Sequence, residues 1–158
     1  MTFNSVRHLI MLSLKDKLKT IKTANGYETN INDNAVREWE PAMIDMEAQT
    51  IAPVQSDYIN IQDSMDQIDE TTIGADEHIL TVDLEFYASG VDAHVKMRKF
   101  AADLIEWVGN NRLLDGVVED MELSGTDSCR LLQHQKKLII YKTELDIVYV
   151  TNTNKAYH

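Results

Sequence analysis

The chain has 158 residues, of which 26 are acidic and 15 are basic, and its formal net charge at pH 7 is −11. A domain of this length buries roughly two-thirds of its unfolded surface, so its stability requires neither a disulfide nor a metal. The single cysteine, Cys129, excludes an internal disulfide. No early apolar segment is long enough for a signal peptide or a membrane span. We therefore expect one domain over 1–158 and no membrane partner.

The negative charge is concentrated in one block of the sequence. Residues 38–95 contain 14 acidic side chains and no Lys or Arg, whereas the rest of the chain contains 12 acidic and 15 basic ones. Such a block repels phosphate groups, which argues against tight nucleic-acid binding through this region. If the acidic block and the basic residues of the rest of the chain lie on different faces of the molecule, the two faces suit head-to-tail association of identical subunits. An acidic surface on a soluble protein is the simpler explanation of the same charges, taken alone.

The first predicted helix ends near the pair Asn25 and Gly26, within the stretch IKTANGYETNI. Upstream of this pair, apolar residues recur every three or four positions, the period of one helix face: Val6, Ile10, Leu14, Leu18 and Ile21. An Asn-Gly pair can form a tight hairpin turn, but after a helix Gly26 is better suited to the left-handed C-terminal cap. Lysines near this end complement the negative end of the helix dipole: Lys15, Lys17, Lys19 and Lys22.

The middle of the chain is predicted to be mostly extended. Residues 28–40 are polar, with Ile31, Val36 and Trp39 as their only large apolar groups, and 42–50 is expected to form a short helical turn. A strand follows at 57–62. The clearest strand is HILTVDLEFYA at 78–88, in which one face is apolar and the other is largely polar.

The last third of the chain shows a helix pattern followed by two strand patterns. Helical spacing returns over 92–108, with Asp92 as the expected N-cap. A short strand at 117–123 and the long strand KLIIYKTELDIVYVTN follow, and 152–158 is expected to be a flexible tail. Alternating strands indicate an antiparallel sheet with one covered face. The predicted fold class is α+β, a mostly antiparallel sheet with two main helices packed on one face and a long β-hairpin with an acidic tip.

The strand at 78–88 is expected to form the centre of the core. Its inward residues are Leu80, Val82, Leu84 and Phe86. The helices are expected to cover them with a second set of apolar side chains: Leu14, Leu18, Phe100, Leu104 and Ile105.

The connection at 63–76 is predicted to be a solvated acidic loop at the end of this hairpin. It is too polar to bury and too long for a simple turn. Asp63, Asp66 and Asp69 are spaced by three, but the segment lacks the alternating ligands, the central Gly and the terminal Glu of a calcium loop. We therefore predict no metal site here.

The sequence indicates no catalytic residue and no cofactor. The five histidines do not show the spacing of a zinc site. Cys129 and His134 are close in sequence, but a catalytic Cys–His pair is defined by geometry rather than by spacing. The six glycines form no phosphate-binding loop.

The order of these segments resembles the tail-terminator proteins of long-tailed bacteriophages. The resemblance covers nearly the whole chain: a leading helix ending in TANGY, a polar extended segment, the strands DYINIQD and HILTVDLEFYASG, the helix VKMRKFAADLIEWVGNN and the closing strand LIIYKTELDIVYVTN. Its most specific piece is IKTANGYETNI. The acidic segment 63–76 matches no part of the family pattern.

The resemblance implies a structural virion protein without catalytic residues. Members of that family form hexameric rings that cap the tail tube, stop its polymerisation and provide the surface for joining the head. The implied partners are other copies of the chain, the tail tube protein and the head–tail connector protein, while DNA passes through without specific binding. The implied location is the tail or neck of the virion, assembled in the cytoplasm of the host bacterium. A different neck protein, or a soluble acidic binding module, is the alternative.

Two sets of side chains are candidates for the ring interface or the channel lining. The first is acidic and lies in the hairpin end: Asp63, Asp66, Asp69, Glu70 and Asp76. The second is basic and lies on the first helix, where it is expected to meet the acidic block of a neighbour: Lys15, Lys17 and Lys19. If apolar contact dominates instead, Trp39 and Tyr58 are the expected anchors.

Overall fold

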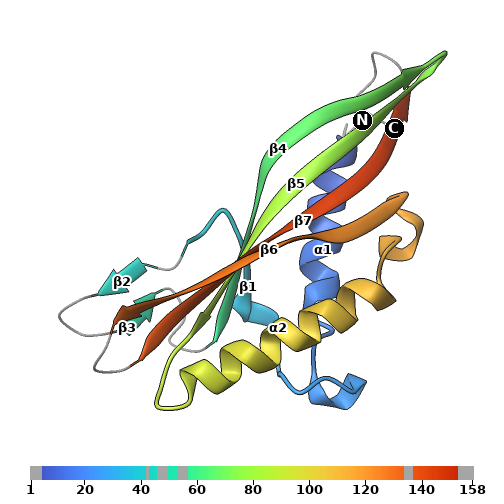
Figure 1. Ribbon diagram of the computed structural model, residues 1–158. Coiled ribbons are helices and arrows are strands. Elements are labelled where there is room, and N and C mark those ends of the chain that lie inside the picture. The colour runs from blue at the N-terminus through green and yellow to red at the C-terminus, as the bar shows by residue number, and fades with distance from the viewer. Residues whose placement is uncertain (1–4, 42, 46–49, 53–56, 134–136, 153–158) are drawn as a thin grey trace.

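The protein folds into a five-stranded sheet with both main helices on one side of it (Figure 1). A computed structural model describes residues 5–41, 43–45, 50–52, 57–133 and 137–152. The sheet order is β1-β4-β5-β7-β6, and only the β1–β4 pair is parallel. The α+β class and the mostly antiparallel sheet are therefore confirmed.

Two α-helices, three short 3-10 turns and seven strands make up the described chain. The helices are α1 (Val6–Leu18) and α2 (Ala93–Asn110). The 3-10 turns are η1 (Thr23–Asn25), η2 (Asp33–Ala35) and η3 (Leu114–Gly116). The strands of the large sheet are β1 (Val36–Glu38), β4 (Tyr58–Thr72), β5 (Ala75–Ala88), β6 (Asp120–Gln133) and β7 (Leu138–Asn152), and β2 (Met43–Asp45) pairs with β3 (Thr50–Ala52) in a separate small sheet.

The first helix is shorter than its sequence predicts. It begins after Ser5, whose hydroxyl accepts a hydrogen bond from the His8 N–H (3.1 Å), and it ends at Leu18. The indole of Trp107 on α2 donates to the carbonyl of Lys17 (3.1 Å), which also accepts hydrogen bonds from the N–H (3.0 Å) and the hydroxyl (2.6 Å) of Thr20. Gly26 has the expected left-handed conformation (φ 94°), but it caps η1 rather than α1. The predicted helix end was wrong because a contact with α2 fixes it.

Three further expectations are corrected by the strands. The helical turn expected within 42–50 is wrong where the chain is described, because Met43–Asp45 pairs antiparallel with Thr50–Ala52. The loop expected at 63–76 is also wrong, because β4 and β5 remain paired as far as Thr72 and Ala75. The short strand expected at 117–123 is the start of the much longer β6. The tail beyond Asn152 and the residue His134 lie outside the described residues.

The core is built between the helices and the central strands, as the alternation predicts. Leu80, Val82, Leu84 and Phe86 are fully buried. The ring of Phe86 stacks on Phe100 of α2 at a centroid distance of 4.1 Å. Ile105 is the exception among the predicted helix residues, since it is 64% exposed and lies on the outer face of α2.

Replacing Leu84 by Ala tests this core. Removing a fully buried leucine side chain leaves a cavity between the sheet and the helices, so we expect the free energy of unfolding to fall by about 2 to 5 kcal/mol. Denaturant unfolding measures the change. Ile105→Ala is the matched control and should lower the free energy of unfolding by less than about 1 kcal/mol. A loss below about 0.5 kcal/mol for Leu84→Ala would contradict the assignment of Leu84 to the sheet face that the helices cover.

Candidate interaction surfaces

One end of the large sheet extends beyond the helices as an arm (Figure 1). We define the arm as 63–72 of β4, 75–82 of β5 and 145–152 of β7, which are paired with one another throughout. Figure 1 shows its β4–β5 turn beyond the N-terminal end of α1. The acidic residues that the sequence singled out in 63–76 all belong to this arm.

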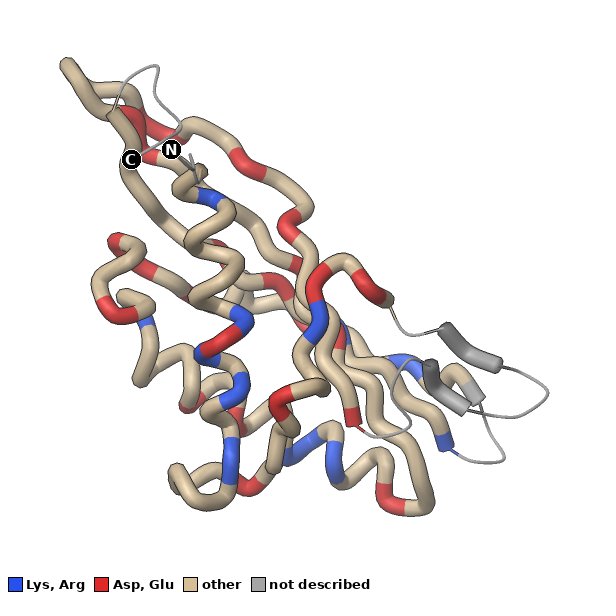
Figure 2. Tube along the Cα trace, turned by 180° about the vertical axis from the view of Figure 1, so that it is seen from behind, with Lys and Arg blue, Asp and Glu red and all other residues tan. Residues whose placement is uncertain are grey.

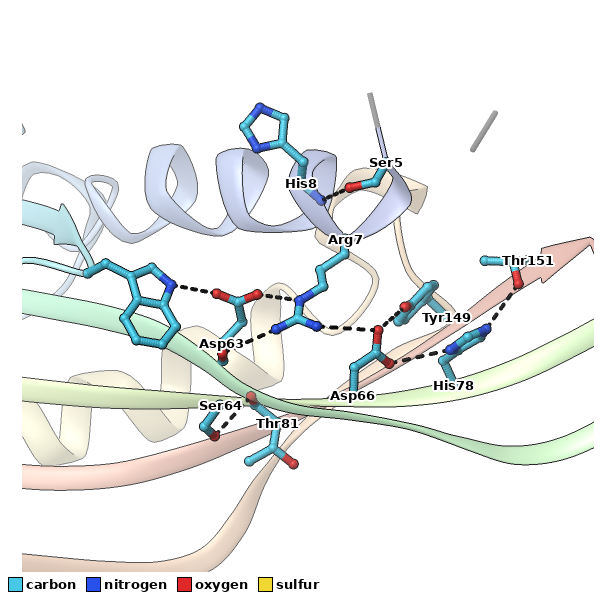
Figure 3. A network of polar contacts seen from close by, with 11 residues as sticks. Ser5, Arg7, His8, Asp63, Ser64, Asp66, His78, Thr81, Tyr149 and Thr151 are labelled. Carbon is cyan, nitrogen blue, oxygen red and sulfur yellow. Dashed lines mark hydrogen bonds and ion pairs between the residues drawn. The ribbon is translucent and has the colours of Figure 1, made fainter. Parts of the chain in front are cut away.

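Arg7 of α1 holds the base of the arm (Figure 3). Its guanidinium donates to the carboxylate of Asp63 and, through Nη2, to the main-chain oxygen of the same residue (3.2 Å). Its Nη1 lies 3.9 Å from Oδ2 of Asp66. Asp63 also accepts a hydrogen bond from the indole Nε1 of Trp39 (2.7 Å). These four side chains connect α1, β4 and the residue that follows β1.

A β-bulge brings the two carboxylates to the same side of the sheet. Residues three apart lie on opposite faces of a regular strand. Here the pairing shifts between Asp63 and Met65, so that Asp63 lies opposite Val82 and Asp66 lies opposite Leu80, both of which face the helices. The sequence spacing alone gives no sign of this shift.

The arm carries a polar group in place of a continuation of the apolar core. Tyr149 donates a hydrogen bond to Asp66 (2.6 Å), and His78 lies 3.4 Å from the other oxygen of Asp66 through Nδ1 and 3.0 Å from the hydroxyl of Thr151 through Nε2. His78 also stacks on Tyr149 at 4.7 Å. Burial and the neighbouring Asp66 raise the pKa of Tyr149, so its hydroxyl keeps the proton that it donates.

We interpret this polar group as structural. The order carboxylate, imidazole and hydroxyl also occurs in nucleophilic triads. However, Thr151 is only 8% exposed, whereas a nucleophile must reach its substrate. Together with Arg7, the group fixes the arm to α1 where the apolar core ends.

The remaining acidic candidates differ in exposure. Asp76 is buried, at 8% exposure, while Asp69 and Glu70 are exposed near the end of the arm. Asp63, Asp66 and Asp69 do not come together as a metal site, because the described part of the chain contains no group of three His, Cys, Asp or Glu side chains placed to hold a metal ion.

The basic candidates on α1 are largely paired within the subunit. Lys17 lies 2.5 Å from Asp115, and Lys19 lies 3.1 Å from Asp16. Lys15 is half-buried and has no ion pair with a described residue. The contact of these lysines with a neighbour's acidic block stays a prediction, and Lys15 is the member most available for it.

The two aromatic candidates have opposite environments. Trp39 is 57% exposed and could contact another molecule. Tyr58 is fully buried and packs against Tyr87 at a centroid distance of 5.4 Å, so it is not an exposed anchor in this subunit. The sequence could not separate them, because Trp39, which follows β1, and Tyr58, which begins β4, are both single aromatic residues next to polar ones.

The sheet face away from the helices is acidic. The pairing register places alternate residues of β5, β6 and β7 on this face, and Figure 2 shows acidic positions along these strands. The acidic members are Glu77, Asp83, Glu85, Asp120, Glu122, Glu144 and Asp146, and the basic ones are Arg130 and Lys142. A hollow of about 370 Å³ lies over the three strands, lined by Asp83, Glu85, Asp127, Lys142 and Glu144 among others.

Glu85 is the most buried carboxylate of the acidic face. Burial raises its pKa, but hydrogen bonds from Lys142 (2.8 Å), Tyr87 (2.7 Å) and Asn60 (3.3 Å) outweigh that effect and hold the pKa below the ordinary value of a glutamate. Glu85 is therefore charged at neutral pH.

Both edges of the large sheet leave backbone groups without a strand partner. β1 pairs with β4 only at Ile59–Ile61, and the N–H of Trp39 adds one bond to Ile61 (3.0 Å). Beyond that point, no described strand pairs with the outer side of β4 from Asp63 to Thr72. The outer side of β6 likewise has no partner among the described strands.

Sequence reasoning missed the role of Arg7 and of the second helix. Arg7 is a single basic residue at the start of a helix, and its partners Asp63 and Asp66 lie 56 and 59 residues away in the sequence. The exposed basic pair Arg98 and Lys99 on α2 was visible, but the facing of the helix had to be known before it could be assigned to a surface.

No family model matches the chain, and no curated protein matches it. Among the helices that the structure describes, none combines the length and the apolar character needed to cross a membrane.

Replacing Arg7 tests its role in the arm. Arg7→Ala leaves two partly buried carboxylates without their cation, and we expect a loss of about 1 to 3 kcal/mol in the free energy of unfolding. Arg7→Lys keeps the charge but not the forked donor geometry and should lose part of this amount. Hydrogen exchange of the amides in 63–68 should rise in Arg7→Ala, and unchanged exchange there would show that the arm does not depend on Arg7.

The depressed pKa of Glu85 predicts a specific pH dependence. A carboxylate whose pKa is lower in the folded state stabilises the fold above its unfolded pKa, and this contribution is lost as the pH falls through the folded pKa. Glu85→Gln should therefore cost about 1 to 2 kcal/mol at pH 7 and progressively less below about pH 4. Denaturant unfolding of both proteins across pH 3–7 measures the difference. A difference independent of pH would contradict the assignment.

Proposed function

We propose that this protein is the subunit of a closed homo-oligomeric ring, a hexamer, that terminates a bacteriophage tail. In this role the ring caps the tail tube, stops its polymerisation and presents a surface to the head–tail connector. The proposal combines the resemblance of the sequence to tail-terminator proteins with three features of the structure: two free sheet edges, an acidic sheet face and a projecting arm.

The two free edges are the observation that carries the proposal. The long strands β4, β5, β7 and β6 are neighbours in this order and alternate in direction. Because their number is even, a simple rotation places β6 of one copy antiparallel to β4 of the next. Repeating the rotation closes a ring with a heterologous interface, in which every copy uses both edges.

The free edge of β4 is protected against unspecific pairing. Exposed strand edges promote aggregation, and charged side chains and bulges are common safeguards. β4 has pairing shifts after Asp63 and after Ile68, and the acidic pair Asp69 and Glu70 lies at the second shift. Such an edge is suited to a partner with a matching shape rather than to any extended chain.

The acidic face supports the passage of DNA through the ring. A surface rich in carboxylates repels phosphate groups and offers no release of counterions on contact. If the face away from the helices lines the channel, DNA crosses it without being held. The helices then form the outside of the ring, where the basic residues gather in Figure 2.

A soluble acidic binding module is the second candidate function. The observation in its favour is the hollow beside Glu85, whose lining contains four carboxylates and one lysine. Such a hollow would accept a basic side chain of a partner protein. This alternative requires no self-association, so the mass in solution separates the two proposals.

The mass of the native protein across a concentration series, alone and with tail tubes, tests the ring. We expect a species of several subunits, and a single-subunit mass under all of these conditions would contradict the proposal. Two exposed positions at nearly the same level of the two edges, Gln67 on β4 and Glu122 on β6, make the interface testable as well. With Gln67→Cys and Glu122→Cys in a Cys129→Ser background, a short bismaleimide should link neighbours into a ladder of products up to the full ring.

Two controls make this crosslinking specific. The single replacements Gln67→Cys and Glu122→Cys, each combined with Cys129→Ser, carry one thiol and therefore stop at dimers. A ladder from the two-thiol protein alone shows that β4 and β6 of different copies adjoin. Dimers from all three proteins, despite a multimeric mass, would place the interface elsewhere.

A further inference from the structure

We infer that the tip of the arm of one copy docks on the exposed side of α2 of another copy. The tip comprises 68–74, the end of β4 and the turn into β5. The inference rests on the self-assembly proposed above but not on the phage role. The two surfaces are complementary in both charge and apolar character, and within one chain they cannot meet.

The tip combines exposed apolar side chains with negative charge. Ile73 is fully exposed (108%) and Ile68 is 57% exposed. Met65, three residues before Ile68 on β4, is 55% exposed. Asp69 and Glu70 are also exposed. No basic residue occurs anywhere in 38–95 to neutralise them.

The fold itself does not require an apolar residue at the turn. Gly74 supplies the positive φ (89°) that the turn between β4 and β5 needs. Turn positions beside such a glycine are usually polar, since Asn, Asp and Ser bond to the local backbone. A β-branched apolar side chain held in water at this position contributes nothing to the subunit. A partner that buried it would remove its apolar surface from water and so stabilise the contact.

The exposed side of α2 has the opposite charge and the same apolar character. Val95 is 40% exposed and Ile105 is 64% exposed. Between them lie the exposed Arg98 and Lys99, neither of which forms an ion pair with a described residue. Lys96, by contrast, is directed inward to Asp57 (3.6 Å) and Asp92 (3.7 Å). Glu106 is the only exposed acidic residue of α2 and lies toward its far end.

The two surfaces lie at opposite ends of the subunit. In both Figure 1 and Figure 2 the β4–β5 turn is at one extreme of the molecule and α2 at the other. The contact must therefore join two copies. Since the tip and α2 are different surfaces, each copy can give one contact and receive another, as a ring or a stack of rings requires.

This assignment places the electrostatic contact on the second helix rather than on the first. Lys17 and Lys19 are already paired within the subunit, whereas Arg98 and Lys99 are free to meet a partner's carboxylates. An arginine in such a contact can donate two parallel hydrogen bonds to one carboxylate, which adds geometric specificity.

Charge reversal with rescue tests the inference. We expect Arg98→Glu with Lys99→Glu to weaken assembly at least about tenfold, and Asp69→Lys with Glu70→Lys to do the same, because each creates like charges across the contact. Combining all four substitutions should restore most of the assembly. Sedimentation velocity over a concentration series at low and moderate NaCl measures each protein, and moderate salt should weaken the wild type as well.

Two further variants separate the alternatives. Ile73→Ser should weaken assembly without lowering the thermal stability of the subunit, since Ile73 packs against nothing in it. Lys15→Glu reverses the unpaired lysine of α1, the acceptor that the sequence predicts, and so compares the two acceptors directly: a contact on α2 leaves the assembly of this variant unchanged. If Lys15→Glu weakens assembly while the α2 reversal does not, the acceptor is α1 and the inference is overturned.

The outcomes also distinguish this inference from the ring proposal. If the wild type assembles and the two-thiol protein forms the crosslinked ladder, but both charge reversals are tolerated, the tip–α2 contact is refuted and the ring proposal is left intact. Failure of the four-fold variant to recover, while it keeps wild-type thermal stability, likewise refutes the contact. Wild type that remains a single subunit at every concentration and with tail tubes contradicts the ring and the contact together.

Discussion

The difference in length between the sheet and its helices governs the rest of this structure. β5 has 14 residues and extends about 46 Å at roughly 3.3 Å per residue, whereas the 18 residues of α2 extend only about 27 Å. The helices can therefore cover one end of the sheet but not both. Where cover ends, the inward face changes from Leu80, Val82 and Leu84 to the polar group of Asp66, His78 and Thr151. The arm is a direct consequence of this mismatch.

The uncovered end is stable because its polar groups satisfy one another. Shielding a carboxylate from water destabilises the folded state unless a cation or hydrogen-bond donors compensate the lost hydration. Arg7, Trp39 and Tyr149 supply those donors to Asp63 and Asp66, and they come from three different parts of the chain. The base of the arm is thus tied to α1 and to the end of β1, while its tip is left free for other contacts.

The charges of the chain are divided among three tasks. The first group, exemplified by Asp63 and Asp66, holds the arm. The second gives the sheet face away from the helices its negative potential, with Glu85 kept charged by its three donors. The third, at Asp69 and Glu70, is exposed at the tip and is opposite in sign to the free cations of α2. A single count of net charge, −11, cannot reveal this division.

The sequence by itself determined the α+β class, the facing of the strand at 78–88 and the helix at its C-terminal side, because those features follow from the local period of apolar residues. It also indicated the acidic block and the position of Gly26 in a left-handed turn. Only the tertiary structure decided where α1 ends, that 63–76 is paired strand rather than loop, and that Tyr58 is buried while Ile105 is exposed. Each of these depends on contacts that a local pattern does not show: Trp107 at the helix end, β5 beside the strand, and Tyr87 against Tyr58. A local pattern records the period of a segment but not the length of the element that covers it, and in this protein that length separates the core from the arm.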